Sequence, residues 1–310
     1  MLLDTASLYF RAFFGVPSSI RASDGTSVNA VRGLLDFVAT LVERHRPDRL
    51  VAAADQDWRP RWRVELVPSY KQHRVDRVDP DGRSIEQVPE ELDAQIPIIV
   101  EVLRALGIPF VGAPDCEADD VIGTLATDAG VPVDVVTGDR DLFQLVNDAA
   151  QVRVLYTARG VGKLEAFDEA AVRSKYGVPP QAYADFATLR GDPSDGLPGV
   201  PGVGDKTAAR LITVHPSLRD LLLAAEGGSA SGGASSAALA KVRGSGDYLR
   251  RAAEVVRVRT DVELGSFSDT LPAAPADPDA WAGLVERWNL GSAANRVTDA
   301  LAAAARERGH

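Results

Sequence analysis

The sequence contains few of the features that would place a protein outside the cell or in a membrane. Cys116 is the only cysteine, which excludes an intrachain disulfide and a metal site built from thiolates alone. The longest apolar runs, such as residues 98–100, fall far short of the roughly 20 residues needed to span a bilayer. The first residues carry neither a basic stretch nor a small-residue cleavage site. We therefore expect a cytoplasmic protein with no membrane segment, in which Cys116 is a small packed residue.

An excess of basic charge is also absent. The 310 residues include 34 basic and 44 acidic side chains, which gives a net charge of -10. A protein that binds many phosphates is usually basic, so one interpretation is an ordinary acidic protein with no nucleic-acid role. The alternative is that the acidic residues are concentrated at one site, and only the motifs can distinguish the two.

Short apolar segments bounded by turns or charge are typical of buried strands. The sequence has four, at residues 1–4, 50–55, 131–137 and 152–156. Apolar residues at helical spacing lie between them, as from Val31 to Val42 and from Leu92 to Leu106. This alternation predicts an α/β fold with a central, mostly parallel sheet flanked by helices.

A change of pattern near Val178 predicts a second domain. Residues 1–177 would form the α/β body, and residues 178–310 would form a helical module, because helices joined by Gly/Pro turns replace the strands. Residues 226–236 are rich in glycine and serine, which predicts a flexible loop with no active role.

Acidic residues recur at the positions where a parallel sheet binds its ligands. Asp4, Asp55 and Asp139 each lie at or just beyond the carboxyl end of a predicted strand. Acidic pairs or triplets also occur at residues 117–120, 139–141 and 192–195. The first of these opens a predicted helix, where the helix dipole alone favours acidic side chains.

A metal site explains the whole set better. Crowded carboxylates repel one another unless cations are present. Mg²⁺ and Mn²⁺ take oxygen ligands, and two such ions about 4 Å apart can activate water and stabilise a leaving oxygen in phosphodiester hydrolysis. With nine acidic residues assigned to metal, 35 remain against 34 basic ones, so the acidity is local.

Two further segments indicate contacts with nucleic acid. Residues 197–209 place several glycines and Lys206 before an Ala-rich helix, an arrangement that binds phosphate or serves only as a turn and cap. Residues 58–77 interleave basic and aromatic side chains, which is typical of single-strand binding. The alternative for this run is a solvated basic loop with partly buried tryptophans.

Five motifs in order resemble the 5′ nuclease and flap endonuclease family, including the 5′ nuclease domain of bacterial DNA polymerase I. They are LLDTASLYFRAF, RWRVELVPSYKQHR, EADDVIGTLA, TGDRDLFQLV and GDPSDGLPGVPGVGDKTAARL. The resemblance extends to about Leu290, with no polymerase domain, so we expect a free-standing enzyme. Thr5, His73 and Gly196 depart from the usual pattern, but no proposed ligand is lost.

The resemblance implies a PIN-like nuclease body with a helical arch over about residues 70–95 and a helix-hairpin-helix in the C-terminal module. It implies a cluster of two or more Mg²⁺ or Mn²⁺ ions held by nine carboxylates: Asp4, Asp55, Glu117, Asp119, Asp120, Asp139, Asp141, Asp192 and Asp195. It implies that Lys71 and Arg74 contact the scissile phosphate. The expected DNA-binding residues are Arg63, Tyr70, Gly202, Gly204, Lys206 and Thr207, with K⁺ often held by backbone oxygens of the hairpin.

We therefore expect a monomeric, structure-specific 5′ nuclease that cuts nicked, gapped or flapped DNA in replication and repair. Two alternatives are open. One is a nuclease directed mainly at RNA primers, or a PIN-type ribonuclease, although the latter usually lacks the hairpin module. The other is a non-catalytic module for branched DNA, which would gain nothing from crowded carboxylates.

Overall fold

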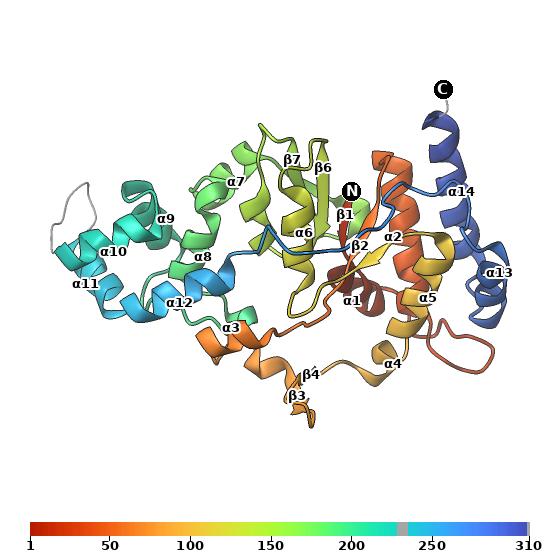
Figure 1. The fold of residues 1–310 in the computed structure, drawn as a ribbon, viewed down its shortest axis with the longest axis horizontal. Coiled ribbons are helices and arrows are strands. Elements are labelled where there is room, and N and C mark those ends of the chain that lie inside the picture. Colours follow the sequence, from red (N-terminus) through yellow and green to blue (C-terminus); the bar gives the residue numbers. More distant parts are fainter. Residues whose placement is uncertain (228–234, 309–310) are drawn as a thin grey trace.

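The structure is a computed structural model that describes residues 1–227 and 235–308 (Figure 1). Six strands form one sheet in the order β5-β2-β1-β6-β7-β8, and only the pair β7 and β8 is antiparallel. Their bounds are β1 (Leu2–Asp4), β2 (Val51–Ala53), β5 (Phe110–Val111), β6 (Val133–Thr137), β7 (Val152–Tyr156) and β8 (Glu165–Phe167). The four strands predicted from the sequence are confirmed, whereas β5 and β8 were not predicted.

Both faces of the sheet are buried, which explains why its strands are apolar throughout. Leu2 and Val135 pack into one core, and their neighbours Leu3 and Val136 pack into the other. The first core includes α6 (Ala118–Ala126) and the segment η2 (Asp141–Leu145). The second includes α1 (Thr5–Gly15), α2 (Asn29–His45), α5 (Ile96–Leu106) and α14 (Gly291–Arg308). The predicted α/β fold with a mostly parallel sheet is confirmed.

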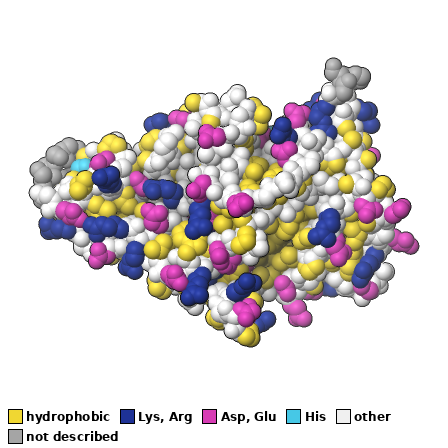
Figure 2. Space-filling model, viewed as in Figure 1, with side chains coloured by type: hydrophobic (Ala, Val, Ile, Leu, Met, Phe, Trp, Pro, Cys, Tyr) yellow, Lys and Arg dark blue, Asp and Glu magenta, His cyan; other side chains and the backbone are white. Residues whose placement is uncertain are grey.

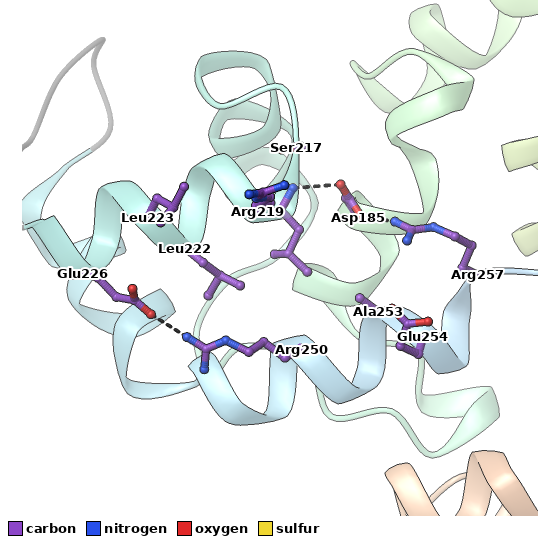
Figure 3. Close-up of a pocket in the computed structure, with 11 residues that line it drawn as sticks. Asp185, Ser217, Arg219, Leu222, Leu223, Glu226, Arg250, Ala253, Glu254 and Arg257 are labelled. Carbon is purple, nitrogen blue, oxygen red and sulfur yellow. Dashed lines mark hydrogen bonds and ion pairs between the residues drawn. The ribbon is translucent and has the colours of Figure 1, made fainter.

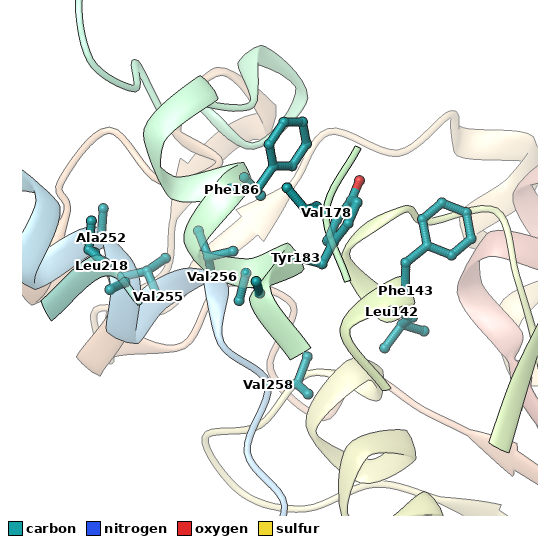
Figure 4. Packing of buried hydrophobic residues seen from close by; sticks show 14 of the residues in the cluster. Leu142, Phe143, Val178, Tyr183, Phe186, Leu218, Ala252, Val255, Val256 and Val258 are labelled. Carbon is teal, nitrogen blue, oxygen red and sulfur yellow. The ribbon is translucent and has the colours of Figure 1, made fainter. Parts of the chain in front are cut away.

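A helical module follows α7 (Glu169–Tyr176) and the turn η4 (Pro180–Ala182). Its helices are α8 (Tyr183–Arg190), α9 (Asp205–Val214), α10 (Leu218–Gly227), α11 (Ser236–Gly244) and α12 (Gly246–Val256). The first core continues into it without a break, since Phe143 beside the sheet packs through Tyr183 towards Phe186 and Val256 (Figure 4). No strand follows Val178 in the described residues. Residues 228–234, most of the predicted Gly/Ser loop, lie outside the described residues.

The last two helices correct the predicted extent of the helical module. After α12 the chain returns across the body, where the backbone N–H of Leu50 donates to the Asp269 carbonyl oxygen at 2.8 Å. Helix α13 (Pro278–Arg287) then packs against α5, and α14 packs against α2, at the opposite end of the molecule from α9 to α12 (Figure 1). The apolar face of α2 needs this cover, so residues 278–308 belong to the α/β body.

The predicted helical arch over residues 70–95 is wrong for most of its length. The segment forms a short 3-10 turn η1 (Gln72–Arg74), an antiparallel hairpin of β3 (Val75–Val78) and β4 (Ser84–Glu86), and one turn of helix, α4 (Glu90–Asp93). Pro80 and Gly82 prevent a helix at the tip. Gly82 adopts a φ of 82°, and the Asp79 carboxylate accepts the backbone N–H groups of Asp81 and Arg83 at 3.0 and 2.7 Å. The helical arch that the resemblance implied is therefore replaced in this chain by a hairpin whose tip has a turn sequence.

Among the described helices, none combines the length and apolar character that a membrane crossing requires.

We predict that Leu301→Ala destabilises the whole protein, because Leu301 is fully buried between α14 and the body. The cavity should lower the free energy of unfolding by about 2–5 kcal/mol, measured by urea denaturation. The matched control Asp299→Ala changes an exposed residue of the same helix and should stay within about 0.5 kcal/mol of the parent. An equally small change for Leu301→Ala would mean that α14 is an independent tail.

Candidate active site

Carboxylates gather at the carboxyl edge of the parallel strands, as the strand ends predicted. Asp4 ends β1, and Asp55 and Asp139 each follow their strand by two residues. Hydrogen bonds hold the carboxylates of Asp4 and Asp55 in place. Asp4 caps α1 by accepting the Ser7 N–H at 3.1 Å and also accepts the Thr137 hydroxyl at 2.7 Å. Asp55 accepts the Ala118 N–H at the start of α6 at 2.9 Å. The sheet therefore places acidic residues from three separate chain segments at the same edge.

These carboxylates line a hollow of about 210 Å³ that we call the first hollow. Lys71 and Arg74 also face it, with Phe10 and Trp58 as its aromatic walls. Its acidic lining is Asp4, Asp55, Glu86, Glu117, Asp119 and Asp139. Glu86, on the hairpin, was missed because nothing in its surroundings in the sequence marks it. Phe10 could have been found, since α1 begins directly after Asp4.

A second, much smaller hollow adjoins the first. It measures about 10 Å³ and is lined by Asp119, Asp141 and Asp195, among others. Asp119 faces both hollows. One oxygen of Asp141, Oδ1, is buried and has no hydrogen-bond partner among the described residues. A buried carboxylate oxygen without a partner is costly, which makes this position suited to a cation.

The electrostatics of the two hollows favour bound cations. Burial, with Asp55 and Asp139 nearby, raises the pKa of Asp4 to about 7. Burial and neighbouring carboxylates also raise the pKa of Asp119 and of Asp141 well above the usual range. The pKa of Asp195 rises to about 6, again mainly through burial. Removing protons from this set without adding a cation is therefore unfavourable.

Glu117 behaves differently because it already has cationic partners. Its carboxylate accepts hydrogen bonds from the Lys71 ammonium and, at 2.7 Å each, from the Arg63 guanidinium and the Tyr70 hydroxyl. Burial opposes the charge, but Lys71 and Arg63 hold the pKa of Glu117 below its usual value. Lys71 in turn keeps its proton, since Glu117 outweighs the effect of burial and raises its pKa.

This network corrects two of the expected DNA contacts. Arg63 is only 2% exposed and lies between Glu117 and Asp120, so it is not available to a DNA strand. Tyr70 is 3% exposed, and its ring packs in the core, so it does not offer a stacking face. Both side chains are instead held inside, where they support Glu117 and Lys71.

Two of the nine expected metal ligands also face elsewhere. Both carboxylate oxygens of Asp120 accept hydrogen bonds from within the protein. The donors are the Arg63 guanidinium at 2.7 Å, the Arg259 N–H at 2.9 Å and the Glu117 N–H at 3.2 Å. Asp192 accepts Arg140 at 3.1 Å and Arg190 at 3.4 Å. The structure brings the other seven together around the two hollows. The positions of the acidic residues at the start of the predicted helix did not indicate that Asp120 points towards the core.

The donor set fits hard divalent cations, because every candidate ligand is a carboxylate oxygen. Among residues 1–227 and 235–308, however, no three acidic, histidine or cysteine side chains have the spacing of a preformed metal site.

The glycine-rich segment forms a hairpin between α8 and α9. Gly199 and Gly202 adopt φ values of 65° and 70°, and a side chain at Gly199 would meet the Arg190 backbone at 2.5 Å. The hairpin delivers the chain to Gly204, the N-cap of α9. Lys206 is exposed at this helix start and, with Thr207, lines a hollow of about 280 Å³. The predicted helix-hairpin-helix arrangement is thus present.

Larger hollows lie away from the carboxylates. One of about 410 Å³ in the helical module mixes Leu222 with Arg250 and Glu226, and beside it Asp185 accepts the Leu218 N–H at 2.8 Å (Figure 3). On the face seen in Figure 2, basic and acidic side chains are interspersed, with no broad patch of one sign. The chemistry of its lining, rather than its size, therefore marks the first hollow as the candidate active site.

A sheet with carboxylates at its carboxyl edge, two basic side chains above them and a helix-hairpin-helix alongside defines a nuclease of the PIN-like α/β type. The chain belongs to the 5′-3′ exonuclease family. Residues 1–177 match the family described as "5'-3' exonuclease, N-terminal resolvase-like domain", and residues 178–279 match "5'-3' exonuclease, C-terminal SAM fold". The protein is accordingly a phosphodiester hydrolase.

Known proteins resemble the chain over nearly its full length. A 5′-3′ exonuclease of Streptomyces coelicolor is 55% identical over 303 residues, covering 98% of this chain and 100% of that protein. DNA polymerase I of Mycobacterium bovis is 42% identical over 316 residues, covering 98% of this chain and 32% of that protein. A bacteriophage T5 flap endonuclease, crystallised with DNA and metal ions, has a TM-score of 0.63 at 17% identity, covering 99% and 98% of the two chains. The last likeness shows the shared fold.

We predict that the metal-free protein loses stability as the pH rises from about 4 to 7. In this window the folded protein keeps protons on Asp4 and Asp195 that the unfolded chain has released, so the free energy of unfolding falls. Asp4→Asn retains the helix cap. It should match the parent at or below about pH 4, where Asp4 is largely protonated in both the folded and the unfolded state, and exceed its stability above pH 7 by about 2–4 kcal/mol in chelator. Denaturation curves at several pH values test this, and a variant less stable than the parent at pH 8 would contradict it.

Proposed function

We propose that this protein is a structure-specific 5′ nuclease that uses divalent cations to cut nicked, gapped or flapped DNA, both as a 5′-3′ exonuclease and as a flap endonuclease. The observation that carries the proposal is the pair of adjoining carboxylate hollows with Asp119 common to both. A role in replication and repair, a cytoplasmic location and a monomeric state belong to the same proposal.

The two hollows suggest how the ions would be divided. Asp4, Asp55, Glu117 and Asp139 would hold one ion with Asp119, and Asp141 and Asp195 would hold the other with Asp119. When bound, Mg²⁺ or Mn²⁺ supplies an activated water and charge that stabilises the leaving oxygen. The carboxylates would orient the ions, and a bound cation would offset the raised pKa values of Asp4, Asp119 and Asp141.

Lys71 and Arg74 would act on the scissile phosphate. Lys71 remains protonated beside Glu117, and Arg74 is anchored by the Ser194 carbonyl at 2.7 Å and by Asp195 at 3.1 Å. Both face the first hollow. Two fixed cations at this position stabilise the negative charge that builds up on the phosphate oxygens during cleavage. Neither residue needs to form a covalent bond to the substrate.

The helix-hairpin-helix would hold duplex DNA through its backbone. The first N–H groups of α9 receive no side-chain cap from Gly204, and Lys206 and Thr207 lie beside them, which suits a phosphate. Gly202 and Gly204 allow close approach of the strand. A K⁺ ion at the hairpin stays a prediction, and the Gly202 carbonyl oxygen already accepts the Lys241 ammonium at 3.0 Å. Because these contacts reach phosphates only, specificity should follow DNA shape.

The decisive experiment maps cleavage on 5′-labelled flap, nick and blunt DNA of matched sequence, with Mg²⁺, Mn²⁺ or chelator. We expect metal-dependent cuts at the branch of the flap and at the nick, and Asp139→Asn should reduce the rate by about 100-fold or more. Asp134→Asn, at the opposite end of β6, is the matched control. Full activity of Asp139→Asn in a clean preparation would reject the proposed metal site.

The same assay tests the RNA-directed alternative. A 5′-RNA flap of equal length, compared with the DNA flap at matched metal concentration, would replace the DNA assignment if it were strongly preferred. No product from any substrate would leave the binding-module alternative.

We predict that Lys206→Ala weakens binding to duplex DNA about equally for all sequences. Loss of one phosphate contact should reduce the slope of log affinity against log salt concentration by about 1. Fluorescence anisotropy between low and physiological salt measures this slope. An unchanged slope together with unchanged affinity would place the duplex somewhere other than the start of α9.

A further inference from the structure

Arg59 occupies a position that its place in a basic run did not predict. It precedes α3 (Arg61–Leu66) and is only 7% exposed. No ion pair within 4.0 Å, among residues 1–227 and 235–308, includes it. A buried guanidinium without a carboxylate is costly unless every donor is occupied, so its neutral partners explain why it is there.

Its partners are almost all on the turn that leads to Lys71. The Arg59 Nε donates to the Tyr70 carbonyl at 2.6 Å, and Nη2 donates to the Pro68 carbonyl at 3.1 Å and to the Gln72 side chain at 2.8 Å. The planar guanidinium thus spans residues 68–72. These acceptors surround Lys71 on both sides in the chain.

Lys71 needs such support because its backbone is strained. Its φ of 46° lies in the left-handed region, which a side chain disfavours. That conformation turns the chain so that the Lys71 N–H donates to the Asp195 carbonyl at 2.9 Å while its ammonium reaches Glu117. The ammonium also donates to the carbonyl of Trp58, the neighbour of Arg59, at 3.3 Å.

The fourth bond of Arg59 reaches the hairpin that stands where an arch was expected. Nη1 donates to the Ser84 hydroxyl at 2.9 Å, and the Trp58 indole donates to the Ser84 carbonyl at 2.9 Å. From the other side, the Gln87 N–H donates to the Arg74 carbonyl at 2.7 Å. The hairpin and the turn bearing Lys71 and Arg74 are therefore tied to a single side chain.

We propose that Arg59 is a positioning residue for phosphodiester cleavage, which locks the β3–β4 hairpin and the Lys71 turn into one unit above the carboxylates. The inference rests on the proposed function, because it assumes that Lys71 and Arg74 act on the scissile phosphate. Arg59 itself does not touch the substrate. Only a planar fork can bond all four acceptors, so lysine cannot replace it.

The test is a double-mutant cycle of Arg59→Lys and Lys71→Ala, measured as single-turnover cleavage of flap DNA with Mg²⁺. We expect Arg59→Lys to slow cleavage roughly 10- to 100-fold, since small misplacements of catalytic groups have effects of this size. Its affinity for the same DNA in Ca²⁺ should change less than about twofold. In the Lys71→Ala background the further loss should be several-fold smaller, because Arg74 is then the only one of the two cations left to position.

Two results would overturn the inference. One is a rate for Arg59→Lys within about twofold of the parent, and the other is the same fold-loss in both backgrounds, which would place its effect elsewhere. Arg153→Ala, an exposed arginine paired with Asp134 far from the hollows, is the control and should cleave at the parent rate. Lack of cleavage by the parent itself would instead mean failure of the proposed function.

Melting curves accompany each variant to separate positioning from unfolding. If Arg59→Lys is not folded at the assay temperature, Gln72→Ala removes one acceptor of the fork and leaves the carbonyl partners in place. The same criteria then apply to Gln72→Ala. A rate loss that is several-fold smaller in the Lys71→Ala background supports the proposal, whereas a parent-like rate, or the same fold-loss in both backgrounds, rejects it.

Discussion

The candidate active site depends on two buried ion pairs, which Glu117 makes with Lys71 and with Arg63. All three side chains are almost fully removed from water, so each charge requires the other two, and removal of one would leave an uncompensated charge in the core. Because Arg63 also holds Asp120, which accepts the Arg259 N–H, the pair connects α3, the start of α6 and the chain segment returning from the helical module. Lys71 is thus fixed by the packing of three segments that are distant in the chain.

A second group of charges has the opposite character. Around the two hollows, no ion pair among residues 1–227 and 235–308 includes Asp4, Asp119 or Asp141, and desolvation together with neighbouring carboxylates raises their pKa values. The fold therefore contains one acidic group that is already neutralised by protein and another that is left for an external cation. Without a bound cation, the carboxylates of the second group lower the stability of the folded protein. Such a loss of stability is common at functional sites.

The sequence predicted the features that depend on local chemistry. Strand ends located Asp4, Asp55 and Asp139, and the glycine pattern located the hairpin before α9, because strand burial and backbone turns are read from neighbouring residues. It failed where long-range packing decides the outcome. Whether Arg63 faces solvent or Glu117 depends on a residue 54 positions away in the chain. The basic run and the acidic helix start were correctly located, but the direction of Arg63, Tyr70 and Asp120 was not.

The return of the chain to the α/β body has a consequence for synthesis on the ribosome. Helix α14 covers α2, so one of the body's two cores is completed only by a helix that is synthesised after the whole helical module. Until then the apolar face of α2 is exposed on a nascent chain, a condition that favours aggregation and chaperone binding. At 5–20 residues per second, roughly 250 residues separate the two helices by about 10–50 s of elongation. Completion of this core therefore waits until residues 291–308 have been synthesised.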